Sequence, residues 1–241
     1  MKITDMHCHV LPGVDDGSAT MEESVETLRS AYEQEITDMI VTPHFHPGRY
    51  VVTAPQIREG IRQLQHRADA EGIHIHLYPG QECYYYSGLV EQLDAGNALT
   101  MNGTKYVLVE FDTDVQYSSI NKAIWELRVS GYEPIIAHYE RYDCLYQRRE
   151  RLEELRENGA MLQMNFDALR HGGSLFRANE WRRLLKKGYV DYLGSDTHGM
   201  KFRPLDIKRA MDWLDADVEP DLKERILNSN IRRLKGDSNK L

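Results

Sequence analysis

Cysteine is scarce in this sequence. The chain has 241 residues and three cysteines, Cys8, Cys83 and Cys144, with no Cys-x-x-Cys spacing among them. An odd number of cysteines argues against a disulfide framework, and the spacing argues against a zinc ribbon. We therefore expect plain thiols and a reducing compartment.

Positive charge and long apolar runs are also lacking. Lys and Arg number 30 against 38 Asp and Glu, which gives a formal net charge of -8. A sequence-independent grip on nucleic acid or anionic lipid is not expected, because both need an excess of cationic side chains. No stretch approaches the roughly 20 apolar residues of a membrane span, and no apolar leader follows the N-terminus. We therefore expect a soluble, cytoplasmic protein without membrane insertion.

Internal repeats, low-complexity linkers and breaks in composition are absent as well, so we predict a single domain over residues 1–241 with a polar tail from about residue 228. The strand patterns lie at 3–10, 38–41, 73–78, 106–111, 134–138, 161–165 and 189–196. Helical patterns lie between and after them, and Thr20 with Glu23 predicts a capping box at the first helix. This alternation predicts a parallel sheet covered by helices, and seven such units predict a closed or nearly closed α/β barrel.

Histidines two positions apart occur in the first strand pattern. Side chains alternate faces along a strand, so His7 and His9 point to one side and Cys8 to the other. A single His-x-His is a weak indication of a metal site. A second pair begins at His44, at the end of the second strand pattern. His74 and His76 lie in mid-strand and are interpreted as structural, facing the helices or solvent.

Further nitrogen and oxygen ligands follow the other predicted strands. In α/β barrels the reactive groups lie at the carboxyl ends of the strands. Glu110 ends an apolar strand, where a carboxylate needs a partner or a metal ion. The ligands that fall on this rim are His7, His9, His44, Glu82, Glu110, His138, Asp196 and His198, with Asp15 or Asp16 in the loop above the first strand. So many ligands on one rim predict a metal site.

Six motifs together resemble the polymerase-and-histidinol-phosphatase (PHP) superfamily. Within it, the chain is similar to the bacterial tyrosine-protein phosphatases encoded with capsular or exopolysaccharide synthesis genes. The motifs are D-M-H-C-H-x-L-P-G-V-D-D-G-S, T-P-H, G-Q-E, L-V-E-F, I-I-A-H-Y-E-R-Y and S-D-T-H-G, and the match runs from residue 3 to about residue 234. The resemblance implies a distorted seven-stranded (β/α)7 TIM-like barrel of the PHP type with three divalent metal ions, usually manganese (Mn2+). It also implies hydrolysis of phosphotyrosine on a protein partner, a bacterial tyrosine autokinase.

The family pattern also suggests roles for individual residues. It implies one metal ion on His7, His9 and Asp196 with Glu110 bridging, a second on Glu82, Glu110 and His138, and a third on Asp16, His44 and His198. Asp15 is left to support a neighbouring ligand or to form the turn of its loop. Arg141 and Arg203 match positions that hold phosphate, and Arg49, in a more variable loop, is predicted to join them. The alternative for Arg141 and Arg203 is pairing with surface acids such as Glu140 or Asp206.

The chemistry of these residues agrees with that implication. Imidazole and carboxylate ligands suit manganese, iron or zinc rather than magnesium alone. Adjacent metal ions can turn a shared water into hydroxide near neutral pH, so we expect direct hydrolysis without a phosphoenzyme. No cysteine has an arginine six positions later, because Val14, Leu89 and Glu150 occupy those places, and the loop of cysteine-dependent tyrosine phosphatases is therefore absent.

Three other functions stay open at this point. A phosphatase for histidinol phosphate or another small molecule, from the same superfamily, would use the same metal ions. An amidohydrolase also begins with a strand His-x-His, but it normally has a metal-bridging lysine in mid-barrel, where this chain has Glu110. A catalytically silent kinase-binding module would lack ligands, and all nine are present. The sequence predicts no oligomeric state.

Overall fold

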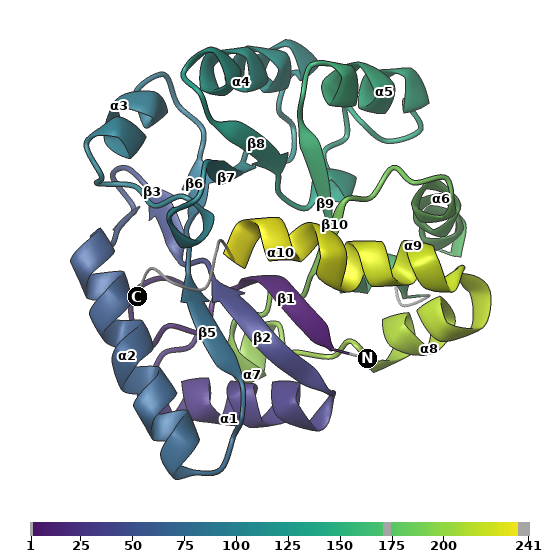
Figure 1. The fold of residues 1–241 in the computed structure, drawn as a ribbon. Helices are drawn as coiled ribbons and strands as arrows, with labels where there is room; N and C mark the ends of the chain where they lie inside the picture. The colour runs from purple at the N-terminus through teal and green to yellow at the C-terminus, as the bar shows by residue number, and fades with distance from the viewer. Residues whose placement is uncertain (1, 171–174, 236–241) are drawn as a thin grey trace.

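The computed structural model describes residues 2–170 and 175–235, in which short strands and helices alternate (Figure 1). The strands are β1 Ile3–Cys8, β2 Ile36–Val41, β3 His44–His46, β4 Tyr50–Val51, β5 His76–Pro79, β6 Glu82–Tyr84, β7 Tyr106–Glu110, β8 Glu133–Ile136, β9 Met161–Asn165 and β10 Tyr192–Gly194. The helices are α1 Met21–Glu33, α2 Ala54–Ala70, α3 Leu89–Asp94, α4 Tyr117–Val129, α5 Arg149–Glu157, α6 Leu175–Lys186, α7 Gly199–Phe202, α8 Lys208–Asp217, α9 Pro220–Glu224 and α10 Asn230–Lys235. Short 3-10 or π turns lie at Met101–Gly103, Tyr139–Arg141, Phe166–Leu169 and Arg225–Ser229.

The strands form two sheets that follow one another around the molecule. One sheet has the order β1-β2-β5 and the other the order β10-β9-β8-β7-β6-β3-β4. Among the described pairs, only the β3–β4 hairpin is antiparallel. Hydrogen bonds from Asp196 N to His7 O (2.8 Å) and from His9 N to Thr197 O (3.0 Å) place β1 beside the end of β10. The result is a curled α/β sheet with helices around its outside (Figure 1).

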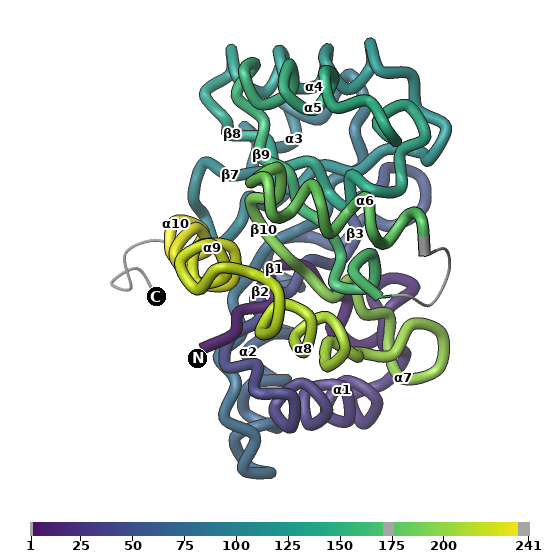
Figure 2. Tube along the Cα trace, turned by 90° about the vertical axis from the view of Figure 1, so that its right-hand side faces the viewer, coloured from purple at the N-terminus to yellow at the C-terminus, as the bar shows by residue number. Residues whose placement is uncertain are grey.

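Two apolar clusters stabilise this arrangement. The larger one lies between the strands and the surrounding helices. The smaller one joins Met6, Ile40 and Leu108 of the strands to Ile231 and Leu234 of α10, all fully buried. Helix α10 therefore lies across the amino-terminal side of the strands, while α7 and β3 lie on the opposite side (Figure 2).

The expected polar tail from about residue 228 is wrong as far as residue 235. Residues 225–235 continue as a π turn and helix α10. Ile231 and Leu234 are apolar side chains three positions apart, so they share one face of the helix, and the cationic residues around them stay at the surface. The part of the predicted tail beyond residue 235 lies outside the described residues.

The capping box expected at α1 is only half formed. Thr20 accepts a hydrogen bond from Glu23 N (3.2 Å), but the Glu23 carboxylate does not return to the backbone of Thr20. It accepts instead from Ala19 N (2.9 Å) and Met200 N (3.1 Å). Glu23 therefore ties the start of α1 to α7. A complete capping box starts α2, where none was predicted.

Several strands are shorter than their sequence patterns. The first ends at Cys8 rather than residue 10, the third begins at His76, and the last spans only Tyr192–Gly194. The β3–β4 hairpin was not predicted, because its two strands are too short to show alternation. His74 and His76 are exposed, as expected. Within residues 2–170 and 175–235, no helix has both the length and the apolar character that a membrane crossing demands.

Candidate metal and phosphate site

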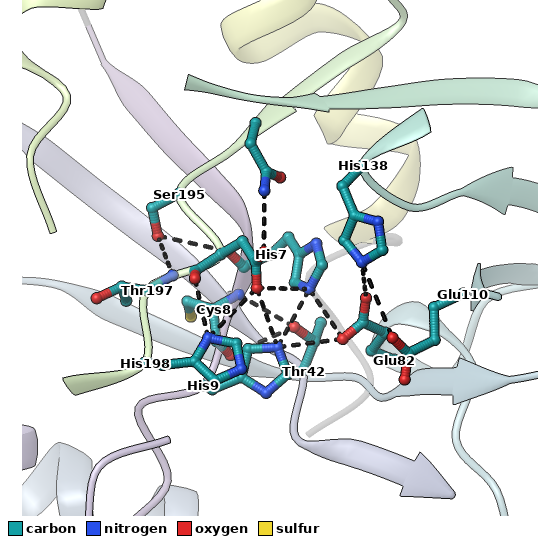
Figure 3. Close-up of polar contacts among 12 residues, drawn as sticks. His7, Cys8, His9, Thr42, Glu82, Glu110, His138, Ser195, Thr197 and His198 are labelled. Carbon is teal, nitrogen blue, oxygen red and sulfur yellow. Dashed lines mark hydrogen bonds and ion pairs between the residues drawn. The ribbon is translucent and has the colours of Figure 1, made fainter. Parts of the chain in front are cut away.

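The carboxyl ends of the strands surround a cavity of about 190 Å³. Most of the predicted site residues line it: Asp16, His44, Arg49, Glu82, Glu110, His138, Arg141, Asp196, His198 and Arg203. The remaining two, His7 and His9, are fully buried and lie against Glu82 (Figure 3). The fold thus brings together residues from both ends of the chain.

The orientation of the His7 ring is set by Gln163 of β9. The Gln163 Oε1 atom accepts a hydrogen bond from the backbone N–H of His138 (2.7 Å), so this atom is the acceptor end of the amide. His7 Nδ1 lies 3.1 Å from the same oxygen and therefore carries the proton. In the neutral imidazole, this leaves the lone pair on Nε2, which points into the cluster.

The His9 ring is held in the same tautomer by Asp15. His9 Nδ1 lies 2.9 Å from Asp15 Oδ2, and the other oxygen of Asp15 accepts from Gly17 N (2.9 Å). Asp15 therefore supports both its loop and the histidine, the place expected for it. A Cβ atom at Gly17 would lie 2.1 Å from His9 O, so only glycine lets the loop approach this closely.

The unprotonated Nε2 atoms of His7 and His9 both lie close to the carboxylate of Glu82. His7 Nε2 and His9 Nε2 lie 3.2 Å apart, and Glu82 Oε2 lies 3.2 Å from each of them. Two lone pairs and a carboxylate oxygen repel one another unless a cation lies between them. Burial alone lowers the pKa of His9, but Asp15 and Glu82 outweigh burial and raise that pKa to about 9. The geometry therefore demands positive charge at this point.

Glu82 is buried at the centre of the cluster. Its Oε1 atom lies 2.9 Å from His138 Nε2, and its Oε2 atom lies 3.2 Å from His44 Nδ1. Within residues 2–170 and 175–235, neither oxygen makes a hydrogen bond, and Asp196 Oδ1 is another buried oxygen without one. A buried carboxylate is costly unless it is paired or bound to a metal ion. Imidazole nitrogens and carboxylate oxygens with free lone pairs fit divalent transition-metal ions.

The candidate ligand atoms form three overlapping groups, each with its atoms within 4.8 Å of one another: His9 with Asp16, His44 and His198; His7 with His9 and Glu82; and His44 with Glu82 and Glu110. The carboxylate nearest to the Nε2 atoms of His7 and His9 is Glu82, where the family pattern suggested Glu110. Glu110 lies 2.8 Å from His44 Nδ1 and 3.8 Å from His138 Nε2. The assignment of ligands to individual ions stays a prediction.

The backbone bends sharply at two of the candidate ligands. His138 follows β8 with a φ of 29°, and Asp196 follows β10 with a φ of 52°. Residues other than glycine rarely adopt positive φ, and such strain is concentrated at functional sites. The Asp196 carboxylate is fixed through Oδ2, which accepts from Asn165 Nδ2 (2.9 Å).

Arg141 and Arg203 converge on the same carboxylate. Arg141 Nη2 lies 2.8 Å from Asp196 Oδ2, and Arg203 Nη1 lies 2.6 Å from it. The predicted alternative partners are engaged elsewhere: Glu140 accepts a hydrogen bond from Asn165 N, and Asp206 pairs with Arg170. Arg49 lies at the cavity edge with its guanidinium 5.0 Å from the centre of the Tyr50 ring.

Gln163, Asn165 and Asp5 contribute to the site but were not singled out from the sequence. Gln163 and Asn165 occupy alternate positions of the apolar strand β9, so they share a face. Their polarity within an apolar run was the available signal, the same one that identified Glu110. Asp5 accepts hydrogen bonds from Ser195 N (2.8 Å) and Ser195 Oγ (2.5 Å), which fixes β1 against the segment that carries Asp196.

The sequence matches known proteins over nearly all of its length. The model of the family described as capsular polysaccharide synthesis, CpsB/CapC, matches residues 3–235. The tyrosine-protein phosphatase YwqE of Bacillus subtilis is 33% identical, with 90% of this chain and 86% of that protein covered. The tyrosine-protein phosphatase CpsB of Streptococcus agalactiae is 29% identical, with 95% and 97% covered.

A solved structure has the same fold. It comes from work on YwqE of Bacillus subtilis and CpsB of Streptococcus pneumoniae, which are described as metal-dependent tyrosine phosphatases. The TM-score is 0.89 at 30% identity, and the match covers 98% of this chain and 96% of the other. The motifs, the curled sheet and these comparisons lead to one conclusion: the chain belongs to the CpsB/CapC family of capsular polysaccharide synthesis proteins.

Proposed function

We propose that this protein is a metal-dependent protein-tyrosine phosphatase. Its substrate would be phosphotyrosine on a bacterial tyrosine kinase that controls capsular or exopolysaccharide synthesis. The observation that carries the proposal is the buried meeting of His7 Nε2, His9 Nε2 and Glu82 Oε2 beneath a cavity edged by arginines. The relatives named tyrosine-protein phosphatases support the choice of substrate.

The proposed cofactor is a set of three divalent metal ions, with Mn2+ first and iron or zinc as alternatives. The residues that would hold them are His7, His9, Asp16, His44, Glu82, Glu110, His138, Asp196 and His198. When bound, such ions activate water near neutral pH and neutralise charge on the phosphoryl group. Gln163 and Asp15 keep the histidine lone pairs directed at the ions, because each fixes the proton on the opposite ring nitrogen.

Arg141 and Arg203 would hold the phosphate. Both guanidinium groups reach the cavity from strand ends and already contact one carboxylate oxygen, so a phosphate oxygen can take up the same donors. Arg49 would assist from the cavity edge. Such donors stabilise charge as it develops in the transition state.

The two buried cysteines, Cys8 and Cys83, are poor nucleophiles in this structure. Cys8 is buried with its Sγ atom 3.4 Å from Ile40 O, and burial raises the pKa of this thiol well above its usual range. Burial also raises the pKa of the Cys83 thiol. The thiolate is the nucleophilic form, so neither residue is suited to attack phosphate.

The proposal includes three further points. The strands would form a closed, distorted seven-stranded (β/α)7 barrel. The hydrogen bonds from Asp196 N to His7 O and from His9 N to Thr197 O support closure between β1 and the end of β10. Residues 1–241 would form one domain, which the family match over residues 3–235 supports. The protein would act in the cytoplasm.

A comparison of substrates tests the reaction. We expect phosphate release from a phosphotyrosine peptide to have the highest kcat/KM, well above that for histidinol phosphate. Chelation should abolish the activity, and Mn2+ should restore it. Preference for histidinol phosphate would instead establish a small-molecule phosphatase. A fully metal-loaded protein without activity on either substrate would contradict the phosphatase proposal.

Substitution of the arginines tests the phosphate site. Arg141→Ala and Arg203→Ala should retain bound metal, while kcat/KM for a phosphotyrosine peptide falls by roughly 10²-fold, on the scale of a lost oxyanion donor. Arg62→Ala is the matched control, because Arg62 pairs only with Glu59 on the exposed face of α2 within the described structure. Wild-type rates in both arginine variants would show that the phosphate site is misplaced.

A further inference from the structure

The wall of the cavity differs in character from one side to the other. One side is aromatic and consists of His46, Tyr50, Tyr84 and Phe111, which we call the aromatic arc. These residues belong to β3, β4 and β6 or follow β7, which are consecutive in the larger sheet. Arg141 follows β8, and Arg203 follows α7 in the segment after β10, farther along the same sheet. Arg49 lies beside Tyr50, so cationic groups edge the cavity on both sides, while the rings are gathered on one.

Contacts at the cavity edge fix the rings of the aromatic arc. The His46 and Tyr84 rings stack with their centroids 4.1 Å apart and an angle of 27° between planes. The Tyr84 hydroxyl donates to Asp112 Oδ2 (2.7 Å), which holds the ring against the end of β7. Tyr50 stacks on His44 at 5.6 Å and 15°. The arc is thus positioned before any substrate binds.

The aromatic arc lines the cavity with aromatic ring surface. His46, Tyr50 and Tyr84 are partly exposed, and the Tyr84 hydroxyl is already engaged. A phosphate group alone has no use for such a surface, because its oxygens are held by cationic donors. A phosphate ester of a phenol has two parts that match the cationic groups and the rings of the cavity. Rings packed against rings gain both apolar burial and favourable edge or offset-stacking contacts.

We propose that the aromatic arc is the subsite for the aryl ring of phosphotyrosine and that it sets the selectivity for aryl over alkyl phosphate esters. This inference rests on the proposed phosphatase function and adds the residues that determine its specificity. Tyr84 and Tyr50 are the main contacts, because they present ring surface at the mouth of the cavity.

The test compares two peptides of identical sequence that carry either phosphotyrosine or phosphoserine. The measured quantity is the ratio of their kcat/KM values, at saturating Mn2+ and with bound metal determined for each variant. Tyr84→Leu and Tyr50→Leu should each lower this ratio at least tenfold. Tyr84→Phe should keep the ratio within about threefold of wild type, because it retains the ring.

The matched control is Tyr132→Leu. The Tyr132 hydroxyl donates to Asp94 Oδ1 (2.8 Å), so this tyrosine resembles Tyr84 in pairing with a carboxylate. It precedes β8 and therefore lies at the opposite end of the strands from the cavity. The ratio should not change in this variant.

Each outcome bears on one of the two proposals. An unchanged ratio in metal-loaded Tyr84→Leu and Tyr50→Leu would overturn the aromatic arc as the aryl subsite. Equal losses on both peptides would do the same, because they would show a general role at the site. Failure of the wild-type protein to hydrolyse phosphotyrosine would instead overturn the proposed function itself.

Discussion

Gln163 holds three parts of the site with one side chain. Its Oε1 atom accepts from His138 N and faces His7 Nδ1, and its Nε2 atom donates to Asn165 Oδ1 (2.9 Å). Asn165 in turn donates to Asp196. One amide on β9 therefore orients the His7 imidazole, holds the backbone at His138 and, through its neighbour, fixes a carboxylate. Residues that orient metal ligands in this way affect metal affinity without touching the metal.

Gln163→Leu should therefore weaken metal binding by roughly 10- to 100-fold, because His7 Nδ1 and the His138 N–H lose their common acceptor. Gln163→Glu keeps an acceptor oxygen and should lose less. A competition titration with a coloured chelator measures the affinity. Gln65→Leu serves as a control, since Gln65 joins α2 to β5 through Ile75 O and Leu77 N. Unchanged affinity in Gln163→Leu would contradict this role.

The sequence is informative about residues whose chemistry is distinctive. Alternation along β1 correctly placed His7 and His9 on one face, and the position of Glu82 after a predicted strand placed it at the same edge. It is less informative about Gln163, because an amide has no preferred metal chemistry. The meeting of Arg141 and Arg203 at Asp196 depends on two strand ends far apart in the chain. No local pattern predicts that meeting.

Helix α10 is the element that covers the strands on the side opposite the cavity. Its two apolar side chains pack on Met6, Ile40 and Leu108, and the Asn102 side-chain amide donates to the carbonyl of Lys235 at its end. Together with α9 and the π turn before it, α10 forms a helical run over residues 220–235, which is marginally stable alone in water. Its stability must come from this packing. The same packing shields the apolar side chains of the strands from water.

Leu234→Ala should accordingly lower the free energy of unfolding by about 2–5 kcal/mol, the usual range for a leucine buried in a core. The neighbouring Arg233→Ala, at an exposed position, should change it by less than about 0.5 kcal/mol. Urea unfolding of the two variants gives both values. A loss below about 1 kcal/mol for Leu234→Ala would mean that α10 is dispensable for stability.

The alternation of strands and helices could be predicted because each unit carries its own apolar periodicity. Helix α10 could not be predicted, because two apolar positions in six residues show no periodicity. The burial of Ile231 and Leu234 depends on strands far away in the sequence. The β3–β4 hairpin was missed for the same reason. The Glu23 contact with α7 also depends on the tertiary structure, since it joins a helix start to a segment far along the chain.

The concentration of histidines and carboxylates makes the stability of the whole molecule depend on pH and on metal. In the metal-free protein the pKa of His9 is raised to about 9, above the ordinary value of 6.5. A raised folded-state pKa contributes stability that is fully present below pH 6.5 and is lost as the pH rises through about 9. Asp5, with a pKa of about 6, and His198, with a pKa of about 4, titrate mainly below this window.

The metal-free protein should therefore lose stability between pH 6.5 and about 9, by roughly 3 kcal/mol from His9 alone. The metal-loaded protein should not lose stability in this range, because metal ions bind deprotonated ligands and take the place of the protons on the histidines. Urea unfolding with chelator and with Mn2+ across this range should give curves that diverge as the pH rises. Parallel curves, or metal-free stability that rises with pH, would contradict the proposed electrostatics.

Because β1 lies beside the end of β10, the site can be completed only late in the synthesis of the chain. His7 leaves the ribosome early, but Asp196 and His198 follow only when most of the chain has been made, which takes on the order of 10–40 seconds at about 5–20 residues per second. During that interval β1 lacks its neighbour at the end of the sheet. The growing chain carries part of the ligand set without the rest, so it is exposed to capture of wrong metals and to mispairing at that edge. Activity should therefore appear abruptly once the segment with Asp196 and His198 has left the ribosome, and should not increase gradually with chain length.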